Sequence, residues 1–326
     1  MRKIDEGAMR RFVAPAAVLV VAVLLVTFPI WSVPWEGSRY ATGILRDMLI
    51  LAILALSLDL LVGSAGMPSL GQSAYFGAGA YAAAIAGQRL GSDDLLLGLG
   101  AAILASSLLA LAIGAVAVRA AGIFFLMLTL AFAQMVFAVA FQAADITGGS
   151  NGFSGVRRPM LFGLDFNGPD ALFHLVAVVF LVVLLLVWRI RSSTYGRALI
   201  GLRENERRMR ALGYDTTRLK LSAFVLAGAI AGVGGALQAY SIRFVSTNDV
   251  GVARSVEAFV SVLIGGASTL LGPVVGAIVV LFIERVMPSY IAFAETVLGL
   301  VFIVFVLAAR QGIVGLVRVA YARARA

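Results

Sequence analysis

Cysteine is absent from this chain, and that absence excludes disulfides, cysteine-bound zinc and thiol chemistry. Histidine occurs once, as His174, so no metal cluster is expected. Charge is scarce too, because 13% of the 326 residues are charged, against roughly 25% in soluble domains. Apolar residues are abundant: 61% of the chain is hydrophobic, and the mean hydropathy is +1.00. This composition predicts an integral membrane protein.

The apolar residues come in runs longer than about 18, the length of membrane-spanning helices rather than of barrel strands. We predict an all-α, polytopic membrane helix bundle of about 8–10 spans, including half-helices around glycine-rich breaks. The predicted spans are 12–30, 44–62, 72–89, 95–118, 121–142, 171–189, 220–241, 271–287 and 291–309. A shorter piece, 255–267, is expected to enter from outside, stop near mid-membrane and lead into the span at 271–287.

Basic residues give the orientation of the spans. The net charge is +9, and with a cytoplasmic N-terminus 18 of the 26 Lys and Arg residues fall inside. The segments of the expected single domain, 1–326, are a cytoplasmic N-terminus 1–11, an inner turn at 119, an outer loop 144–170, a cytoplasmic loop 190–219 flanked by basic residues at 189 and 220, and a cytoplasmic tail 310–326. The first span lacks a small-residue cleavage site, so we expect it to be retained. This charge pattern is typical of inner loops and anionic lipid rather than of nucleic-acid binding.

Two glycine-rich stretches interrupt the predicted spans where a membrane helix should be most regular. The first, from Leu58 to Ala84, reads LDLLVGSAGMPSLGQSAYFGAGAYAAA. The second reads VLIGGASTLLGPVVGAIVV and has the same order of half-helix, glycine-rich break and helix. Irregular backbone at membrane depth is tolerated only where protein or a water-filled cavity satisfies it, and such breaks in both halves of a chain indicate a transport path.

The candidate residues of this path are those whose polar groups need partners at depth, together with an apolar lining. They are Asp59, Gly63, Ser64, Gly66, Ser69, Gln72, Tyr75, Gly265 and Gly266. Asp59 is the clearest candidate, because an ionisable residue inside a membrane span is expected to be functional. We expect it to cap the backbone at the break or to bond the amides of the glycine loop. No pair of Asp, Glu or Lys across spans suits proton or sodium coupling, which argues against an ion-driven carrier.

The loop 190–219 is rich in arginine, and its sequence predicts one amphipathic helix, 197–212, ended by Gly213. Its basic face would consist of Arg203, Arg207 and Arg210, and its i,i+4 ion pairs would be Glu204–Arg208 and Glu206–Arg210. The helix is either a docking element for a cytoplasmic partner or a solvated loop that follows the positive-inside rule. No phosphate-binding loop is present in the sequence, so nucleotide energy would have to come from another chain.

The outer loop 144–170 contains DITGGSNGFSGVRRP, in which clusters of Gly, Ser and Asn predict turns. It is either a landing place for a delivering protein or solute, or an ordinary connection. Further along, GAIAGVGGA at 228–236 has GxxxG spacing and predicts close helix packing.

Five stretches together resemble a known family. They are LDLLVGSAGMPSLGQSAYFGAGAYAAA, GIFFLMLTLAFAQM, the TGG of the outer loop, GRALIGLRENERRMRALGYDTTRLKLSAF and VSVLIGGASTLLGPVVGAIVV. In this order, from Asp47 to Gly312, they resemble the LivM-type permeases of branched-chain amino acid ABC importers. The resemblance implies a subunit of the bacterial inner membrane that passes leucine, isoleucine or valine from a soluble binding protein, driven by ATP hydrolysis in partner chains.

The resemblance also implies partners and residue roles. The partners would be a LivH-type permease, two cytoplasmic ATPases that bind ATP and magnesium, an extracytoplasmic solute-binding protein and membrane lipid. This chain would hold no cofactor or metal and would not be an enzyme. The loop helix would couple to the ATPases through Arg203, Glu204, Glu206, Arg207, Arg210 and Gly213. The binding protein would contact Thr147, Gly148, Gly149 and Asn151.

The sequence departs from the family pattern at two places. Arg208 and Met209 stand where the coupling loop usually has alanines, which leaves open the side chains that enter the ATPase. Asp59 stands where many relatives have asparagine, which leaves its ionisation open. Other functions also stay open: a related permease for urea, an amide or an aromatic acid, or an ion-coupled secondary carrier. A membrane enzyme has no clustered acid, base or nucleophile to support it. Pairing with a second copy of this chain, in place of a LivH-type subunit, is open as well.

Overall fold

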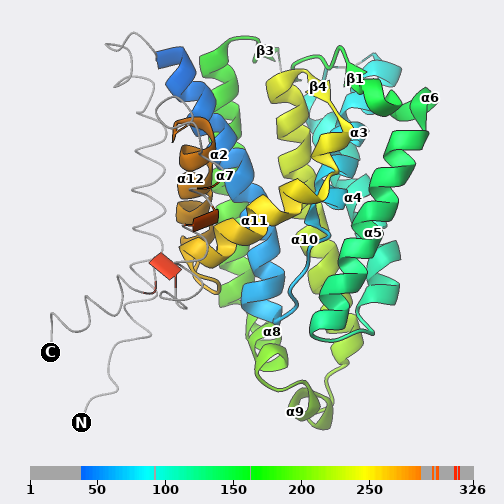
Figure 1. Cartoon of the computed structure of the whole chain (residues 1–326), viewed down its shortest axis with the longest axis vertical. Helices are drawn as coiled ribbons and strands as arrows, with labels where there is room; N and C mark the ends of the chain where they lie inside the picture. The colour runs from blue at the N-terminus through cyan, green and yellow to red at the C-terminus, as the bar shows by residue number, and fades with distance from the viewer. Residues whose placement is uncertain are drawn as a thin grey trace, which may run out of the picture.

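The computed structural model of the chain describes residues 38–91, 93–161 and 163–287, together with 296, 299–300, 312–313 and 315. The predicted span 12–30 lies outside these residues, and 291–309 lies almost entirely outside them. Within the described part the chain forms a bundle of helices, as Figure 1 shows.

The long helices of the bundle coincide with predicted spans. They are α2 (Ser38–Asp59), α3 (Gln72–Leu90), α4 (Leu95–Ala117), α5 (Ile123–Gln142), α7 (Pro169–Ser192) and α10 (Thr216–Ile242). A π-helix, η1 (Leu60–Ala65), continues α2. Five helices of the described part, with α2 and η1 taken together, are long and apolar enough to cross a membrane. The prediction of an all-α, polytopic membrane bundle is therefore confirmed.

Two half-length helices form a hairpin near the end of the described chain. α11 (Val252–Gly265) and α12 (Gly272–Arg285) have 14 residues each and are about 21 Å long, shorter than the roughly 30 Å hydrocarbon core of a bilayer. Pro273 stands in the first turn of α12, where backbone N–H groups lack helical partners in any case. The two helices touch closely, because a Cβ on Gly276 would overlap the Ser261 carbonyl. The short helix expected at 255–267 is thus present as α11.

α10 is the central helix of the bundle and packs against α3 and α4. A Cβ on Gly232 would overlap Ser106 of α4, and one on Gly79 of α3 would overlap the Gly232 backbone. The close packing predicted for GAIAGVGGA is therefore confirmed. α4 and α5 instead expose large apolar side chains, among them Leu104 and Phe124, as expected of surfaces that face lipid.

The two ends of the bundle carry different short elements (Figure 1). One end has α6 (Ala144–Thr147), η2 (Gly149–Asn151), β1 (Phe153–Ser154), β2 (Met160–Leu161), β3 (Leu164–Asp165), β4 (Phe244–Val245) and η3 (Thr247–Asp249). β1 pairs with β4 and β2 with β3, both antiparallel, so the loop 144–170 folds against the chain that follows α10. The opposite end has α8 (Thr194–Glu204) and α9 (Glu206–Ala211).

Candidate functional site

Two interruptions of the helices, far apart in sequence, meet beside α8, where Ser268 is exposed in the described structure. The first break comprises η1 and the loop 66–71 that leads to α3, and the second break is the loop 266–271 between α11 and α12. The Ser268 hydroxyl donates a hydrogen bond of 2.9 Å to the carbonyl of Gly63. Position 63 requires glycine, because a Cβ there would overlap the Asp59 carboxylate and lie 2.6 Å from the Ser268 nitrogen. The two breaks are therefore parts of one structure.

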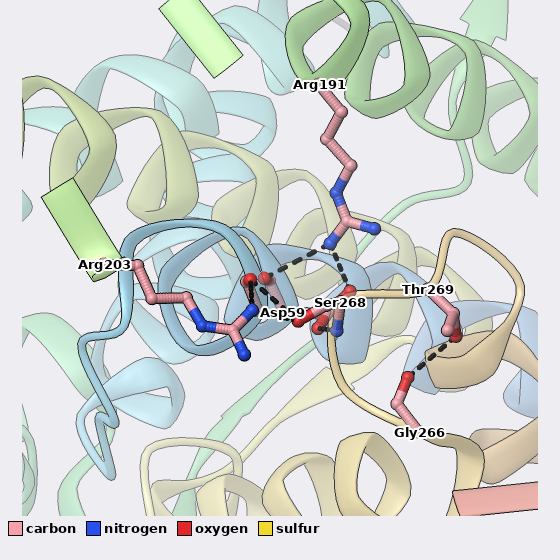
Figure 2. Close-up of polar contacts among 7 residues, drawn as sticks. Asp59, Arg191, Arg203, Gly266, Ser268 and Thr269 are labelled. Atoms are coloured by element: carbon pink, nitrogen blue, oxygen red, sulfur yellow. Dashed lines mark hydrogen bonds and ion pairs between the residues drawn. The ribbon is translucent and has the colours of Figure 1, made fainter. Parts of the chain in front are cut away.

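Asp59, the last residue of α2, links these breaks to a third element. Its buried carboxylate accepts a 2.9 Å hydrogen bond from the Ser268 N–H and forms an ion pair with Arg191, near the end of α7 (Figure 2). Arg191 also donates to the Asp59 carbonyl, over 3.3 Å. The carboxylate thus bonds a loop amide, as expected, but the amide belongs to the second break. Removing one member of such a pair is strongly destabilising, since the other charge is left buried and unpaired.

Arg203 reaches the same place from α8. Its guanidinium donates to the Gly63 carbonyl, over 2.6 Å, and to the Ser268 hydroxyl, while its aliphatic stem covers Gly66. Figure 2 shows Arg191 and Arg203 approaching the two breaks from different sides. We call this group the junction; its members are Asp59, Gly63, Arg191, Arg203 and Ser268.

The predicted single helix 197–212 is wrong. α8 and α9 are separated by Asn205, whose backbone is extended with φ −160° and ψ 96°. The Asn205 side chain accepts a 2.9 Å hydrogen bond from the N–H of Arg208 and so caps α9. Asparagine is among the best residues for this position, and its preference for a cap outweighs the helical pattern around it.

The break at Asn205 separates residues that one helix would have placed together. The Arg203 guanidinium bonds the two breaks, so Arg203 does not share a basic face with Arg207 and Arg210. The predicted ion pair between Glu204 and Arg208 is also missing from the described structure, because the two residues lie on different helices. The predicted basic face is thus divided between the junction and the outside of α9.

Glu206 fastens α9 to the bundle. Its carboxylate binds Arg210 over 2.7 Å, as the i,i+4 spacing predicts, and Lys220 of α10 over 2.8 Å. Burial alone would raise the pKa of Glu206, but the hydrogen bonds and charges of Lys220 and Arg210 outweigh burial and hold this pKa below its usual range. Gly213 follows α9 with a φ of 87°, the left-handed conformation expected of a glycine after a helix end.

The other candidate path residues are not members of the junction. Those that are buried are Ser64, Ser69, Gln72, Tyr75, Gly265 and Gly266. Ser69 accepts the N–H of Gly71 over 3.1 Å, which helps to satisfy the first break. Both side-chain amide atoms of Gln72 are buried without a hydrogen bond in the described structure. Tyr75 packs edge-on against Phe224, with ring centroids 5.5 Å apart, and therefore belongs to the core.

An open cavity of about 210 Å³ lies beside the junction. The first break, the turn 120–122 and the connection from α8 to α9 surround it. Its wall includes Phe125, Arg203, Glu206 and Lys220. Arg203 therefore has one side toward the cavity and its guanidinium in the junction.

In the loop 144–170, which the sequence predicts to be outer, the predicted contact residues form a tight turn. The Thr147 hydroxyl donates to the Ala140 carbonyl over 2.6 Å, and Gly148 and Gly149 both have left-handed φ values. Thr147 is buried at 9% exposure, whereas Asn151 is exposed. The first three residues thus shape the turn, and Asn151 presents its side chain to the outside.

The sequence analysis does not predict Arg191 and Ser268 as site residues. A signal for Arg191 exists, because the orientation rule places the end of the 44–62 span beside the basic loop that begins at residue 189. Ser268 has no such signal, since its left-handed φ of 69° is uncommon for serine. The described residues contain no group of His, Asp or Glu that could hold a metal ion.

Most of the chain is similar to known proteins. Residues 40–309 match the family described as branched-chain amino acid transport system, permease component. The high-affinity branched-chain amino acid transport system permease protein LivM of Salmonella typhimurium is 29% identical over 97% of this chain and 77% of that protein. The probable LivM of Methanocaldococcus jannaschii is 24% identical over 77% of this chain and 82% of that protein. The autoinducer 2 import system permease protein LsrC of Escherichia coli is 26% identical over 38% of this chain and 34% of that protein. No solved structure matches.

Proposed function

This chain belongs to the family of permease components of branched-chain amino acid transport systems, and from that premise we propose that it carries leucine, isoleucine and valine across the bacterial inner membrane as one half of an ABC importer. It is a multi-pass membrane protein. A soluble binding protein delivers the amino acid to the outer end, and ATP binding and hydrolysis in partner chains drive alternating access. Both termini are cytoplasmic in this proposal.

The junction is the observation that supports this proposal best. Two breaks in the helices meet there, and Arg203, from the loop between α7 and α10, bonds both of them. Such irregular backbone is tolerated where it lines a path or is buried in protein. A loop that would dock an ATPase therefore lies directly against the segments that would open and close the route. An ordinary solvated loop has no reason to send a side chain into both breaks.

The partners follow from what the chain contains and lacks. Its sequence has no phosphate-binding loop, so ATP and magnesium are assigned to two cytoplasmic ATPase subunits, and this chain is assigned no cofactor and no catalytic role. The exposed parts of α8 and α9 would dock those subunits. Exposed Asn151 and the turn beside it would receive the binding protein. A LivH-type permease would supply the other half of the path.

Reconstitution tests the proposal. Proteoliposomes that hold both permeases and both ATPases should take up radiolabelled leucine only when the binding protein is outside and ATP is inside. Proteoliposomes with this chain alone should take up nothing. Uptake by this chain alone under a proton or sodium gradient would overturn the ABC mechanism in favour of a secondary carrier.

The identity of the solute needs a separate test, on the binding protein. The LsrC match concerns a permease named for autoinducer 2, so likeness to this family does not by itself fix the solute. A ligand screen on the binding protein encoded beside this chain should rank leucine, isoleucine and valine above urea, amides and aromatic acids. The opposite ranking would replace the substrate while leaving the permease role intact.

A further inference from the structure

We propose that Arg203 is the side chain through which the ATPases act on the transport path, holding the two breaks together and releasing them when α8 moves. This inference rests on the proposed function, because it takes α8 and α9 to be the docking loop. In this inference Arg203 transmits the movement of the loop and does not contact the ATPase. Ser268 is the residue that Arg203 releases.

Arg203 has a position that suits transmission. It lies next to the end of α8, at the wall of the open cavity, and its guanidinium bonds the Gly63 carbonyl over 2.6 Å and the Ser268 hydroxyl. One side chain thus joins the docking loop to both breaks. A hydrogen bond is lost beyond about 3.5 Å, so a shift of α8 by 1–2 Å, typical of switching helices, is enough to break the bonds between Arg203 and the two breaks.

The other basic side chains of the loop bond locally where the described structure shows a partner. Arg197 donates to the Ser192 carbonyl, Arg210 binds Glu206, and Arg218 binds Asp215. Arg191 reaches the junction too, but from α7, one of the helices long enough to span the membrane. Within the short helices of the loop, Arg203 is therefore the residue that can carry a movement into the breaks.

Ser268 is the element that Arg203 restrains. Its φ of 69° is left-handed, a conformation that is strained for a non-glycine residue and persists only when its surroundings impose it. Three bonds impose it here: N–H to the Asp59 carboxylate, hydroxyl to the Gly63 carbonyl, and guanidinium of Arg203 to the hydroxyl. Gly66, at the first break, has a similar φ of 70° without the strain. Withdrawing Arg203 thus acts on the strained break.

The experiment uses the whole importer in proteoliposomes, with binding protein outside, and measures leucine uptake and ATP hydrolysis together. Arg203→Ala should raise the ATP consumed per leucine by about fivefold or more, the range of ordinary coupling free energies. ATP hydrolysis should also depend less on the binding protein. The ATPases should copurify with this variant as they do with the wild type. Arg218→Ala is the matched control: it removes the same charge from a side chain of α10 that is 89% exposed and lies outside the docking helices, and it should leave the ratio unchanged.

Two further variants keep the test informative if Arg203→Ala assembles poorly. Ser268→Ala removes the hydroxyl and keeps the strained backbone, so it should raise the same ratio by a smaller factor. Ser268→Gly removes the strain as well, and should change the ratio at least as much as Ser268→Ala.

Three results have defined meanings. An unchanged ratio in both Arg203→Ala and Ser268→Ala, in complexes that assemble, would overturn the inference. Loss of ATPase copurification in Arg203→Ala, with a normal ratio in Ser268→Ala, would overturn it too and make Arg203 a docking contact. Absence of leucine uptake in the wild-type importer would instead contradict the proposed function.

Discussion

The two breaks have the same order of helix, glycine-rich loop and helix, yet they are held in different ways. Two neutral hydroxyls hold the loop of the first break and the start of α3 that follows it: Thr129 of α5 accepts the Leu70 N–H over 3.2 Å, and Ser255 of α11 accepts the Ser73 N–H over 2.8 Å. Arg203 adds one charged donor, to the Gly63 carbonyl. The second break is held from outside by the charged carboxylate of Asp59, and by Arg203. One break is thus built into the core, while the other depends on a few bonds that can be withdrawn.

The two breaks also differ in backbone conformation, and this difference supports the same conclusion. The first break turns at Gly66, where a left-handed φ is free of strain, and the second turns at Ser268, where it is not. A segment that is strained and held by few contacts belongs to the part of a protein that opens at low free energy. The comparison therefore assigns a fixed role to the first break and a moving role to the second.

The largest effect should come from Asp59→Ala. This variant leaves Arg191 without its carboxylate and the Ser268 N–H without its acceptor, so it should lower the free energy of unfolding by about 3–5 kcal/mol. Hydrogen exchange should rise more at 266–271 than at 66–71, although Asp59 adjoins the first break. Asp47→Asn is the control on the same helix, since the Asp47 side chain is 26% exposed and its pair is weak. Equal exchange at the two loops would contradict the comparison.

Gly63→Ala should have the next largest effect. The added methyl group would overlap the Asp59 carboxylate and crowd the Ser268 nitrogen, so the breaks would have to separate, at about 1–3 kcal/mol of stability. Thermal unfolding in detergent measures the loss. Gly43→Ala, in α2, has no atom within 4 Å of the new Cβ and should be neutral or slightly stabilising. Similar melting temperatures for both variants would argue that the breaks do not touch.

A smaller loss of stability is expected when either of two threonines, one bonded to each break, is replaced by valine. Thr129→Val removes the acceptor of the Leu70 N–H and should cost about 1 kcal/mol, a typical value for a hydrogen bond inside a membrane protein. Thr269→Val removes a bond of 2.7 Å to Gly266 within the same loop, and should cost less because the loop can adjust. Melting temperatures of the two variants, with Thr129→Ser as control, check the order. A larger loss in Thr269→Val would reverse the roles assigned to the two breaks.

The smallest effect should lie outside both breaks, at Glu206. Its pKa is lowered in the folded protein, so its contribution to stability is present above the unfolded pKa and is lost as pH falls through the lower, folded pKa. The contribution is modest, since the Glu206 side chain is 29% exposed. The difference in melting temperature between wild type and Glu206→Gln should therefore shrink as pH falls from 7 to about 3. A difference that grows on acidification would contradict the lowered pKa.

Local sequence signals predict the helices, the two breaks and part of the junction. Apolar runs give the spans, glycine clusters give the breaks, and a lone Asp59 in an apolar stretch gives the first member of the site. Ser268 lies 209 positions from Asp59, and pairing over that distance depends on how helices pack rather than on any local pattern. Asn205 is a missed local signal, because its preference for a helix cap divides a segment that charge spacing alone predicts as one helix.

The partners of Asp59 are synthesised well after Asp59 itself, so the junction can form only late in synthesis. Arg191 is made 132 residues after Asp59, and Ser268 is made 209 residues after it. At roughly 5–20 residues per second, the carboxylate waits about 10–40 s before the last of these partners leaves the ribosome. Until Arg191 is made, α2 must enter the bilayer with an unpaired acid, which its long apolar sequence makes tolerable. The end of the permease that carries α8 and α9 therefore takes its final form late in synthesis, after nearly all of the described chain has been made.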